Sequence, residues 1–271
     1  MMLAQLEPSP DPQSAAVAPL PPSLSVVIPA RDEERRLGAS LLRLARYLEA
    51  RSVSAEVIVV DDGSRDATAL VAEGHSELFD VLRVVRPSSA GGKGAAIRAG
   101  WLAARGALVL TLDVDSGTPM EAFERLEASI RRGSDIAIGA RSWASAPASL
   151  GARCARVAAR GLATVAATLV PTGIRDTQTG FKLVRGSIAR ELARLSEIDG
   201  RAFDVEVLAL ARQIGLRITE IELPSRCPRR PSWREVAQVP RTVADLVRIR
   251  RRIVRQRRSR LPDLHRSPRL C

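Results

Sequence analysis

Between residues 24 and 141 the chain repeats one pattern, in which a short apolar run ends in a polar turn and a stretch with helical spacing follows. Short apolar runs bounded by turn residues are typical of strands buried on both faces. Alternation of such strands with helices predicts an α/β fold with a mainly parallel central sheet and helices on both sides. The predicted strands are residues 24–28, 56–60, 81–85, 107–112 and 135–139.

Charged side chains follow the carboxyl ends of four of these five runs. In open α/β sheets this edge is where ligands bind. Independent solvated turns would not need to share it, so we expect these side chains to form one site. They are Glu33, Asp62, Asp113 with Asp115, and Arg141.

The fourth run ends in Asp113-Val114-Asp115. Positions i and i+2 of a strand point to the same face, which would put the two carboxylates about 6–7 Å apart. They repel each other unless a cation lies near them, and hard oxygen ligands favour Mg²⁺ or Mn²⁺. The pair therefore predicts a metal site for a diphosphate, and the simpler interpretation is a solvated Asp-x-Asp that opens a loop.

Residues 88–94, with the sequence SSAGGKG, form a glycine-rich turn before a predicted helix that includes Trp101. The turn is not an ATP-hydrolysing P-loop, because Gly94 follows Lys93 where that motif requires Ser or Thr. Free backbone N–H groups at a helix N-terminus together with one lysine can still bind an anion. Lys93 is therefore a candidate phosphate contact.

The second half of the chain holds fewer clear signals. A helix is predicted over residues 149–169, and a polar cluster that includes Asp176 precedes an apolar run at residues 181–183. Residues 203–211 predict a helix, in which Asp204 and Glu206 are interpreted as acids that favour the helix N-terminus. Residues 216–223 alternate in polarity, which predicts a strand.

The net charge of +12 is concentrated at the C-terminus. Residues 226–271 contain 15 arginines and three acidic residues, so residues 1–225 are neutral as a whole. From residue 235 onward apolar residues recur among the arginines, which predicts a basic amphipathic helix, or a pair of helices broken near Pro240. Such segments are attracted to anionic membrane surfaces. A nucleic-acid-binding tail is the alternative, and an aromatic content of 3% argues against it.

These patterns divide the chain into three parts. Residues 1–23 are predicted to be a disordered leader that is not a signal peptide, residues 24–234 the α/β domain, and residues 235–271 the basic tail. The chain contains no run of 18 apolar residues, so a membrane-spanning helix is not predicted. The three cysteines lack metal-binding spacing, which favours a reducing compartment such as the cytoplasm.

Several motifs, in this order, resemble glycosyltransferase family 2, and within it the dolichyl and polyprenyl-phosphate hexosyltransferases. They are VVIPARDEE, VIVVDDGSRDAT, GGKGAAIRAG, the Asp-x-Asp, IGAR, RDTQTGFKL and AFDVEVL. The last two are most similar to dolichyl-phosphate β-glucosyltransferases. The resemblance covers about residues 24–234 and implies a GT-A nucleotide-sugar-binding fold.

The resemblance also implies roles for individual residues. Pro29, Ala30 and Glu33 would line the nucleoside pocket, Asp62 would contact the base, Asp113 would lie near the ribose and sugar, Asp115 would bind Mg²⁺ or Mn²⁺, Lys93 and Arg141 would lie near the phosphates, and Asp176 would lie in the reaction centre. Asp176, Arg141 and Asp113 are therefore the catalytic candidates. Candidate contacts to the acceptor phosphate are Arg226, Arg229, Arg230, Ser232 and Arg234.

The implied activity is inverting transfer of a hexose, with UDP-glucose the favoured donor, to a polyprenyl or dolichyl monophosphate. The enzyme would be peripheral on the cytoplasmic face of a membrane, with no nucleic-acid partner. A GDP-mannose-dependent mannosyltransferase is an alternative, although Ser116-Gly117 replaces the Leu-Gln usual there, and Arg31 stands where those enzymes often have an aromatic residue. A pseudoenzyme that binds the donor without transfer is another.

Overall fold

The computed structural model describes residues 22–88, 90–114, 120–141, 161, 164–166, 168–170, 172–174, 176–177, 179–223 and 237–258. The predicted leader lies outside these residues except at its last two positions. Of the helix predicted over residues 149–169, the described residues 161, 164–166 and 168–169 are helical.

The first half of the chain alternates strands and helices as the sequence predicts. Each predicted strand is present, with ends that differ by at most two residues. The elements are β1 (Leu24–Ala30), α1 (Glu34–Ala50), β2 (Ala55–Asp61), α2 (Thr68–Glu73), the 3₁₀ turn η2 (Ser76–Leu78), β3 (Val81–Val85), α3 (Lys93–Ala103), β4 (Leu108–Leu112), α4 (Ala122–Arg131) and β5 (Ile136–Arg141).

The second half contains β6 (Phe181–Arg185), α6 (Gly186–Leu195), α7 (Phe203–Gln213), β7 (Ile218–Leu223) and α9 (Val239–Arg258). Helix α6 was not predicted from the sequence, and it begins directly after β6 without an intervening turn. In the described part of the predicted basic segment, Ala237 is helical, Gln238 is in a turn and α9 begins at Val239, so a break in the helix lies near Pro240. Pro240 lies in the first turn of α9, where a missing backbone N–H costs no helical hydrogen bond.

The strands form one seven-stranded sheet with the order β3-β2-β1-β4-β6-β5-β7. All neighbouring pairs are parallel except those of β6, which runs antiparallel to both β4 and β5. Because β6 is reversed, its first residue Phe181 pairs with Leu112 at the end of β4. The segment that leads into β6 therefore reaches the same edge of the sheet as the carboxyl ends of β1, β2 and β4.

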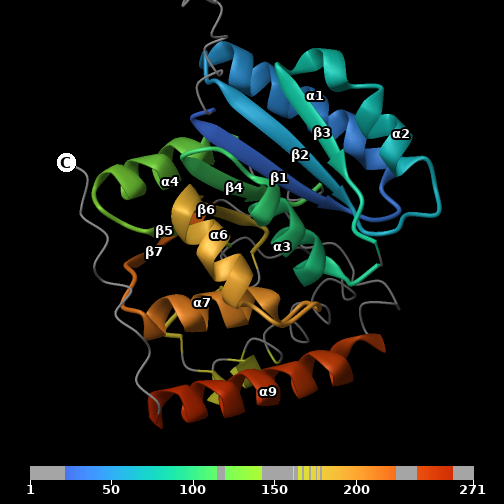
Figure 1. The fold of residues 1–271 in the computed structure, drawn as a ribbon. Coiled ribbons are helices and arrows are strands. Elements are labelled where there is room, and N and C mark those ends of the chain that lie inside the picture. The colour runs from blue at the N-terminus through green and yellow to red at the C-terminus, as the bar shows by residue number, and fades with distance from the viewer. Residues whose placement is uncertain are drawn as a thin grey trace, which may run out of the picture.

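Helices cover both faces of the sheet (Figure 1). Val26 and Ile28 of β1 pack in the core beneath α1, α2 and α4, whereas Val27 packs in the core beneath α3, α6 and α7. Alternate side chains of one strand thus supply both cores, as expected for a strand buried on both faces. The predicted α/β architecture is confirmed.

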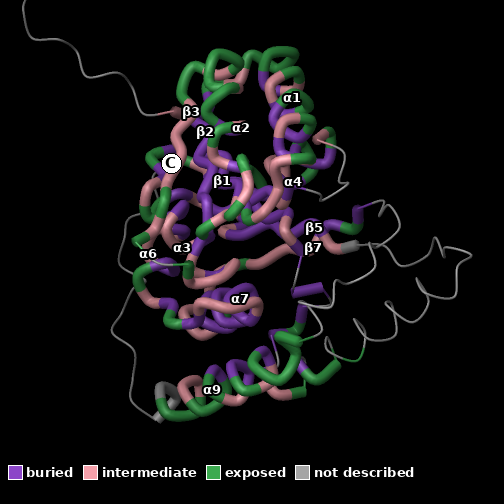
Figure 2. Tube along the Cα trace, turned by 90° about the vertical axis from the view of Figure 1, so that its right-hand side faces the viewer, coloured by how far each residue is buried: buried purple, intermediate pink, exposed green. Residues whose placement is uncertain are grey.

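Helix α7 lies between the sheet and α9 (Figure 1). Its residues 203–211 are all buried, which makes it a central helix (Figure 2). Leu246 and Ile249 of α9 are buried toward α7, while the arginine-rich outer side of α9 is exposed. Of the helices in the described part of the chain, none combines the length and apolarity needed to span a bilayer.

Candidate active site

Asp62 follows β2 at the carboxyl edge of the sheet and binds the glycine loop, which we define as residues 91–94. Its Oδ1 accepts hydrogen bonds from the backbone N–H groups of Gly91, at 2.9 Å, and Gly92, at 3.0 Å. Its Oδ2 lies 3.2 Å from Nη1 of Arg31. Gly92 has a φ of +108°, a conformation that favours glycine. The buried carboxylate thus fixes the loop that leads into α3.

The turns after β1 and β2 are locked together by hydrogen bonds between backbone and side chains. The N–H of Asp32 donates to Oγ of Ser64 at 3.0 Å, and the N–H of Glu33 donates to Oγ1 of Thr68 at 2.8 Å. The carboxylate of Glu33 pairs with Arg36 at 2.7 Å. The structure therefore brings together the predicted nucleoside contacts, because Pro29 and Ala30 pair with Val60 and Asp61 in the adjoining strands.

Lys93 and Asp113 form an ion pair, in which Nζ lies 2.8 Å from Oδ2. Lys93 begins α3 and Asp113 directly follows β4. Burial acts to raise the pKa of Asp113, but Lys93, Lys182 and Arg201 lower it below its ordinary value. Burial acts to lower the pKa of Lys93, but Asp113 and Asp204 raise it above its ordinary value. Both groups are therefore charged at neutral pH.

Gly180 fixes the position of Asp113 from the reversed strand. Its carbonyl oxygen accepts a hydrogen bond from the N–H of Asp113 at 3.2 Å. A Cβ atom at position 180 would overlap the Asp113 carboxylate, so no larger residue fits there without displacing it. The glycine of the DTQTGFKL motif is therefore needed for close approach of the chain to Asp113.

A second ion pair, between Lys182 and Asp204, is buried in the protein near the first pair. Nζ of Lys182 lies 2.8 Å from Oδ1 of Asp204 and also donates to the carbonyl oxygen of Thr179. The pair joins β6 to α7 and contributes to the electrostatics of Lys93 and Asp113. Asp204 was interpreted from the sequence only as an acid that favours the helix N-terminus, and no role was assigned to Lys182, although a lysine inside the apolar run FKLV was a signal that a buried partner exists.

The α6–α7 segment, residues 196–202, supports the glycine loop from the other side. The carbonyl oxygen of Asp199 accepts a hydrogen bond from the N–H of Ala95 at 3.1 Å, and the carboxylate of Asp199 pairs with Arg98 of α3 at 2.7 Å. Glu206 of α7 accepts hydrogen bonds from the N–H groups of Glu197 and Ile198. Glu206 is thus a buried support for this segment, beyond its predicted effect on the helix N-terminus.

The structure describes only some of the remaining predicted site residues. Asp176 is buried in the approach to β6, and its N–H donates to Oε1 of Glu220 at 3.0 Å. Arg141 ends β5 at the same edge, but its side chain is not described. Within the described ranges no three His, Cys, Asp or Glu side chains gather as a metal site. Asp115, Arg226, Arg229, Arg230, Ser232 and Arg234 lie outside these ranges.

The sheet and the charged edge define a class of protein. The mixed seven-stranded sheet, with helices on both faces and charged residues at its carboxyl edge, matches the GT-A fold in solved structures. The model of glycosyl transferase family 2 matches residues 25–192, and the chain belongs to this family. The resemblance found in the sequence motifs is confirmed.

Among curated proteins the chain is 36% identical to dolichyl-phosphate beta-glucosyltransferase of Drosophila melanogaster and 34% identical to that of Homo sapiens, over 212 residues each. These alignments cover 73% of this chain and 65% of each relative, so the chain spans slightly less than two thirds of their length.

Among solved structures the chain is similar to glucosyl-3-phosphoglycerate synthase from Mycobacterium tuberculosis, crystallised with Mn²⁺, uridine diphosphate and glucosyl-3-phosphoglycerate. The TM-score is 0.65 with 22% identity, covering 84% of this chain and 80% of that one. At this identity the likeness shows the fold alone, which is the predicted GT-A fold.

Proposed function

We propose that the chain transfers glucose from UDP-glucose to a dolichyl or polyprenyl monophosphate, with inversion at the anomeric carbon. The observation that carries the proposal is the Lys93–Asp113 ion pair, which joins the glycine loop held by Asp62 to the carboxyl edge of the sheet. Family membership and the names of the fly and human relatives support the choice of substrates.

Charge neutralisation at the leaving group is the main chemical requirement. The bond between the anomeric carbon and the diphosphate oxygen breaks, and its electron pair leaves with UDP. Cationic donors that are already in place stabilise such a developing charge strongly. In our proposal Lys93 and Arg141 supply these donors, while the ionised Asp113 accepts hydrogen bonds from ribose or sugar hydroxyls.

A divalent cation, Mg²⁺ or Mn²⁺, would complete this neutralisation. Asp115 is the proposed protein ligand, since a carboxylate is a hard oxygen donor and Asp115 lies two residues after the anchored Asp113. When bound, the metal would stabilise the diphosphate charge as a Lewis acid. The structural relative from Mycobacterium tuberculosis was crystallised with Mn²⁺ and supports this choice.

The nucleophile would be an oxygen of the lipid monophosphate, which forms the new bond to the anomeric carbon. By analogy with phosphorylated side chains, its second pKa is about 6, so it is mostly dianionic at neutral pH. Such a nucleophile needs no general base. Asp176 is therefore proposed to orient the reacting groups and not to accept a proton.

The acceptor requires a membrane surface, and we propose peripheral binding on its cytoplasmic face. The exposed arginines of α9 support this proposal, because polybasic amphipathic segments are attracted to anionic headgroups. Arg226, Arg229, Arg230, Ser232 and Arg234 remain the proposed contacts to the acceptor phosphate.

A transfer assay tests the proposal. The purified chain is incubated with dolichyl phosphate in detergent and radiolabelled UDP-glucose or GDP-mannose, with Mg²⁺, Mn²⁺ or a chelator. We expect metal-dependent formation of glucosylated lipid from UDP-glucose. Asp115→Ala should abolish it, and Asp80→Ala, which removes an exposed aspartate elsewhere, should not.

Three results would contradict parts of the proposal. Full activity of Asp115→Ala in the presence of chelator refutes the metal assignment. Transfer from GDP-mannose alone refutes the donor. Salt-sensitive RNA binding without any binding of a sugar nucleotide supports the nucleic-acid alternative instead.

A further inference from the structure

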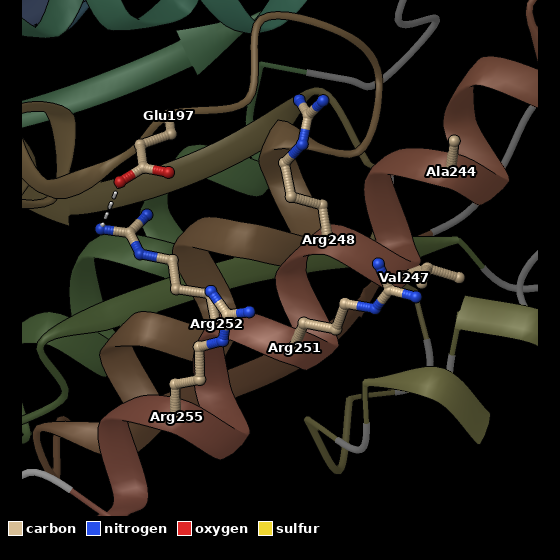
Figure 3. A pocket seen from close by; sticks show the side chains of 7 residues that line it. All are labelled: Glu197, Ala244, Val247, Arg248, Arg251, Arg252 and Arg255. Carbon is tan, nitrogen blue, oxygen red and sulfur yellow. Dashed lines mark ion pairs between the residues drawn. The ribbon is translucent and has the colours of Figure 1, made fainter.

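A basic pocket of about 640 Å³ lies against α9 (Figure 3). We call it the α9 pocket. Its lining combines α9 side chains with one residue of the α6–α7 segment. The lining residues are Glu197, Ala244, Val247, Arg248, Arg251, Arg252 and Arg255.

One wall of the pocket is rigid. The guanidinium of Arg252 donates to Oε1 of Glu206 and to the carbonyl oxygen of Leu195, both at 2.8 Å, and lies 3.2 Å from Oε1 of Glu197. Only 20% of the Arg252 side chain is exposed. This guanidinium therefore forms a fixed wall whose charge is already balanced by Glu197 and Glu206, and a ligand would contact the other arginines of the pocket.

The charge of the pocket favours an anion. Four guanidinium groups line it, and Glu197 is the single carboxylate among the described lining residues. Arg248 and Arg251 are exposed, and Asp245 lies 3.6 Å from Arg248. Guanidinium groups bind phosphate oxygens through paired hydrogen bonds, so a phosphate is the anion that they suit best.

The pocket also has an apolar side, formed by Ala244 and Val247. Elsewhere on α9, the exposed fractions of Val239 and Val254 are 40% and 47%. Arginines beside exposed valines suit a phosphate that is attached to hydrocarbon chains. No aromatic side chain lines the pocket in the described structure, which argues against stacked nucleic-acid bases.

We propose that the α9 pocket binds the phosphate headgroup of an anionic membrane phospholipid, at a site separate from the acceptor phosphate. The inference deepens the proposed function and depends on the enzyme working at a membrane. Glu197 belongs to the segment that supports the glycine loop, so the pocket is connected through this segment to the loop that carries Lys93.

Vesicle binding of the full chain tests the site. Vesicles of phosphatidylcholine alone are compared with vesicles that also contain phosphatidylglycerol. The triple variant Arg248→Gln/Arg251→Gln/Arg255→Gln removes three pocket arginines and leaves Arg252 in place. One arginine near an anionic surface is worth about fivefold in affinity, so we expect a loss of about 100-fold on phosphatidylglycerol vesicles.

The matched control, Arg43→Gln/Arg46→Gln/Arg132→Gln, removes three exposed arginines from α1 and the end of α4 on the other side of the sheet. It changes the net charge equally and should bind vesicles like the unchanged chain. An equal loss in both variants would overturn the proposal, because net charge alone would then explain binding. Unchanged binding of the pocket variant would also overturn it.

Two further arms separate ligand sources. If inorganic phosphate at millimolar concentration competes with phosphatidylglycerol, the pocket is a free-phosphate site and the proposal is overturned. If RNA binds the pocket more tightly than vesicles do, the pocket is a nucleic-acid site and the proposal is likewise overturned. Transfer to acceptor in detergent is measured separately. Its absence refutes the proposed function, whereas unchanged vesicle binding by the pocket variant refutes only the site.

Discussion

Arg252 of α9 reaches the buried carboxylate of Glu206 in α7, with 2.8 Å between Nη1 and Oε1. The side chain of Glu206 is only 3% exposed, and burial raises its pKa above the ordinary value even though Arg252 and two backbone N–H groups act to lower it. The last described helix is thus tied to the segment that supports the glycine loop.

The first prediction is that Arg252→Ala destabilises the protein by about 3 kcal/mol, because a buried carboxylate loses its cationic partner. The free energy of unfolding is measured by urea denaturation. Arg251→Ala, one residue away on the exposed side of α9, should change it by less than about 0.5 kcal/mol. Equal losses in the two variants would show that the ion pair is not the cause.

The second prediction concerns Gly180. Gly180→Ala places a methyl group where the Asp113 carboxylate lies, so Asp113 must move away from Lys93. We expect kcat/KM for hexose transfer to fall at least about tenfold, which corresponds to about 1.4 kcal/mol of lost transition-state stabilisation. Gly161→Ala is the control, since nothing lies within 4 Å of a Cβ at that position. Full activity of Gly180→Ala would contradict a role for Asp113 in its observed position.

The third prediction uses the pKa of Asp113, which Lys93 lowers despite burial. In Lys93→Met this cation is lost, and the pKa of Asp113 rises. The acidic limb of the profile of kcat/KM, measured between about pH 4 and pH 8, should shift to higher pH. Lys93→Arg keeps the charge and should keep the limb closer to its original position. An unshifted limb in Lys93→Met would exclude Asp113 as the group that titrates.

The fourth prediction concerns the contribution of Glu56 to stability, at the start of β2 and away from the candidate site. Burial acts to raise the pKa of Glu56, but hydrogen bonds from Ser25, the backbone N–H of Arg105 and Arg83 lower it below its ordinary value. Its stabilising effect is therefore complete above the unfolded pKa of about 4.3 and is lost as pH falls through the lower folded pKa.

Glu56→Gln should consequently cost about 1–3 kcal/mol at neutral pH and less at the lowest pH at which the protein stays folded, because the native carboxyl becomes protonated as the pH falls through its lowered pKa. Thermal unfolding at the two pH values measures the difference. Glu49→Gln, on the exposed side of α1, removes the same charge and should have little effect at either pH. A deficit in Glu56→Gln that does not change with pH would contradict the assignment.

The strands of the first half were predictable because each is a short apolar run with turn residues at its end. Helix α6 was not, because it follows β6 without a break and pattern alone does not separate the two. The reversed direction of β6 also has no local signal, since it depends on pairing with both β4 and β5.

The site was predictable where one chain segment carries the signal. Asp62 and Asp113 follow buried strands, so their position at the sheet edge follows from the fold class. Glu206 was interpreted only through its place near a helix N-terminus, because its partner Arg252 lies 46 residues later and no local pattern links them. The role of Asp62 as an anchor for Gly91 and Gly92 likewise depends on contacts between distant segments.

The place of β6 in the sheet also sets an order of assembly. Among the described strands, β5 pairs only with β6 and β7, both of which are synthesised after it, whereas β1 to β4 can pair among themselves as soon as they emerge. During translation the first four strands can therefore form a sheet while both edges of β5 are still unpaired. The described sheet is complete only when residues 181–185 lie between β4 and β5, so the pairing of the first four strands with the last three depends on a strand that is synthesised late.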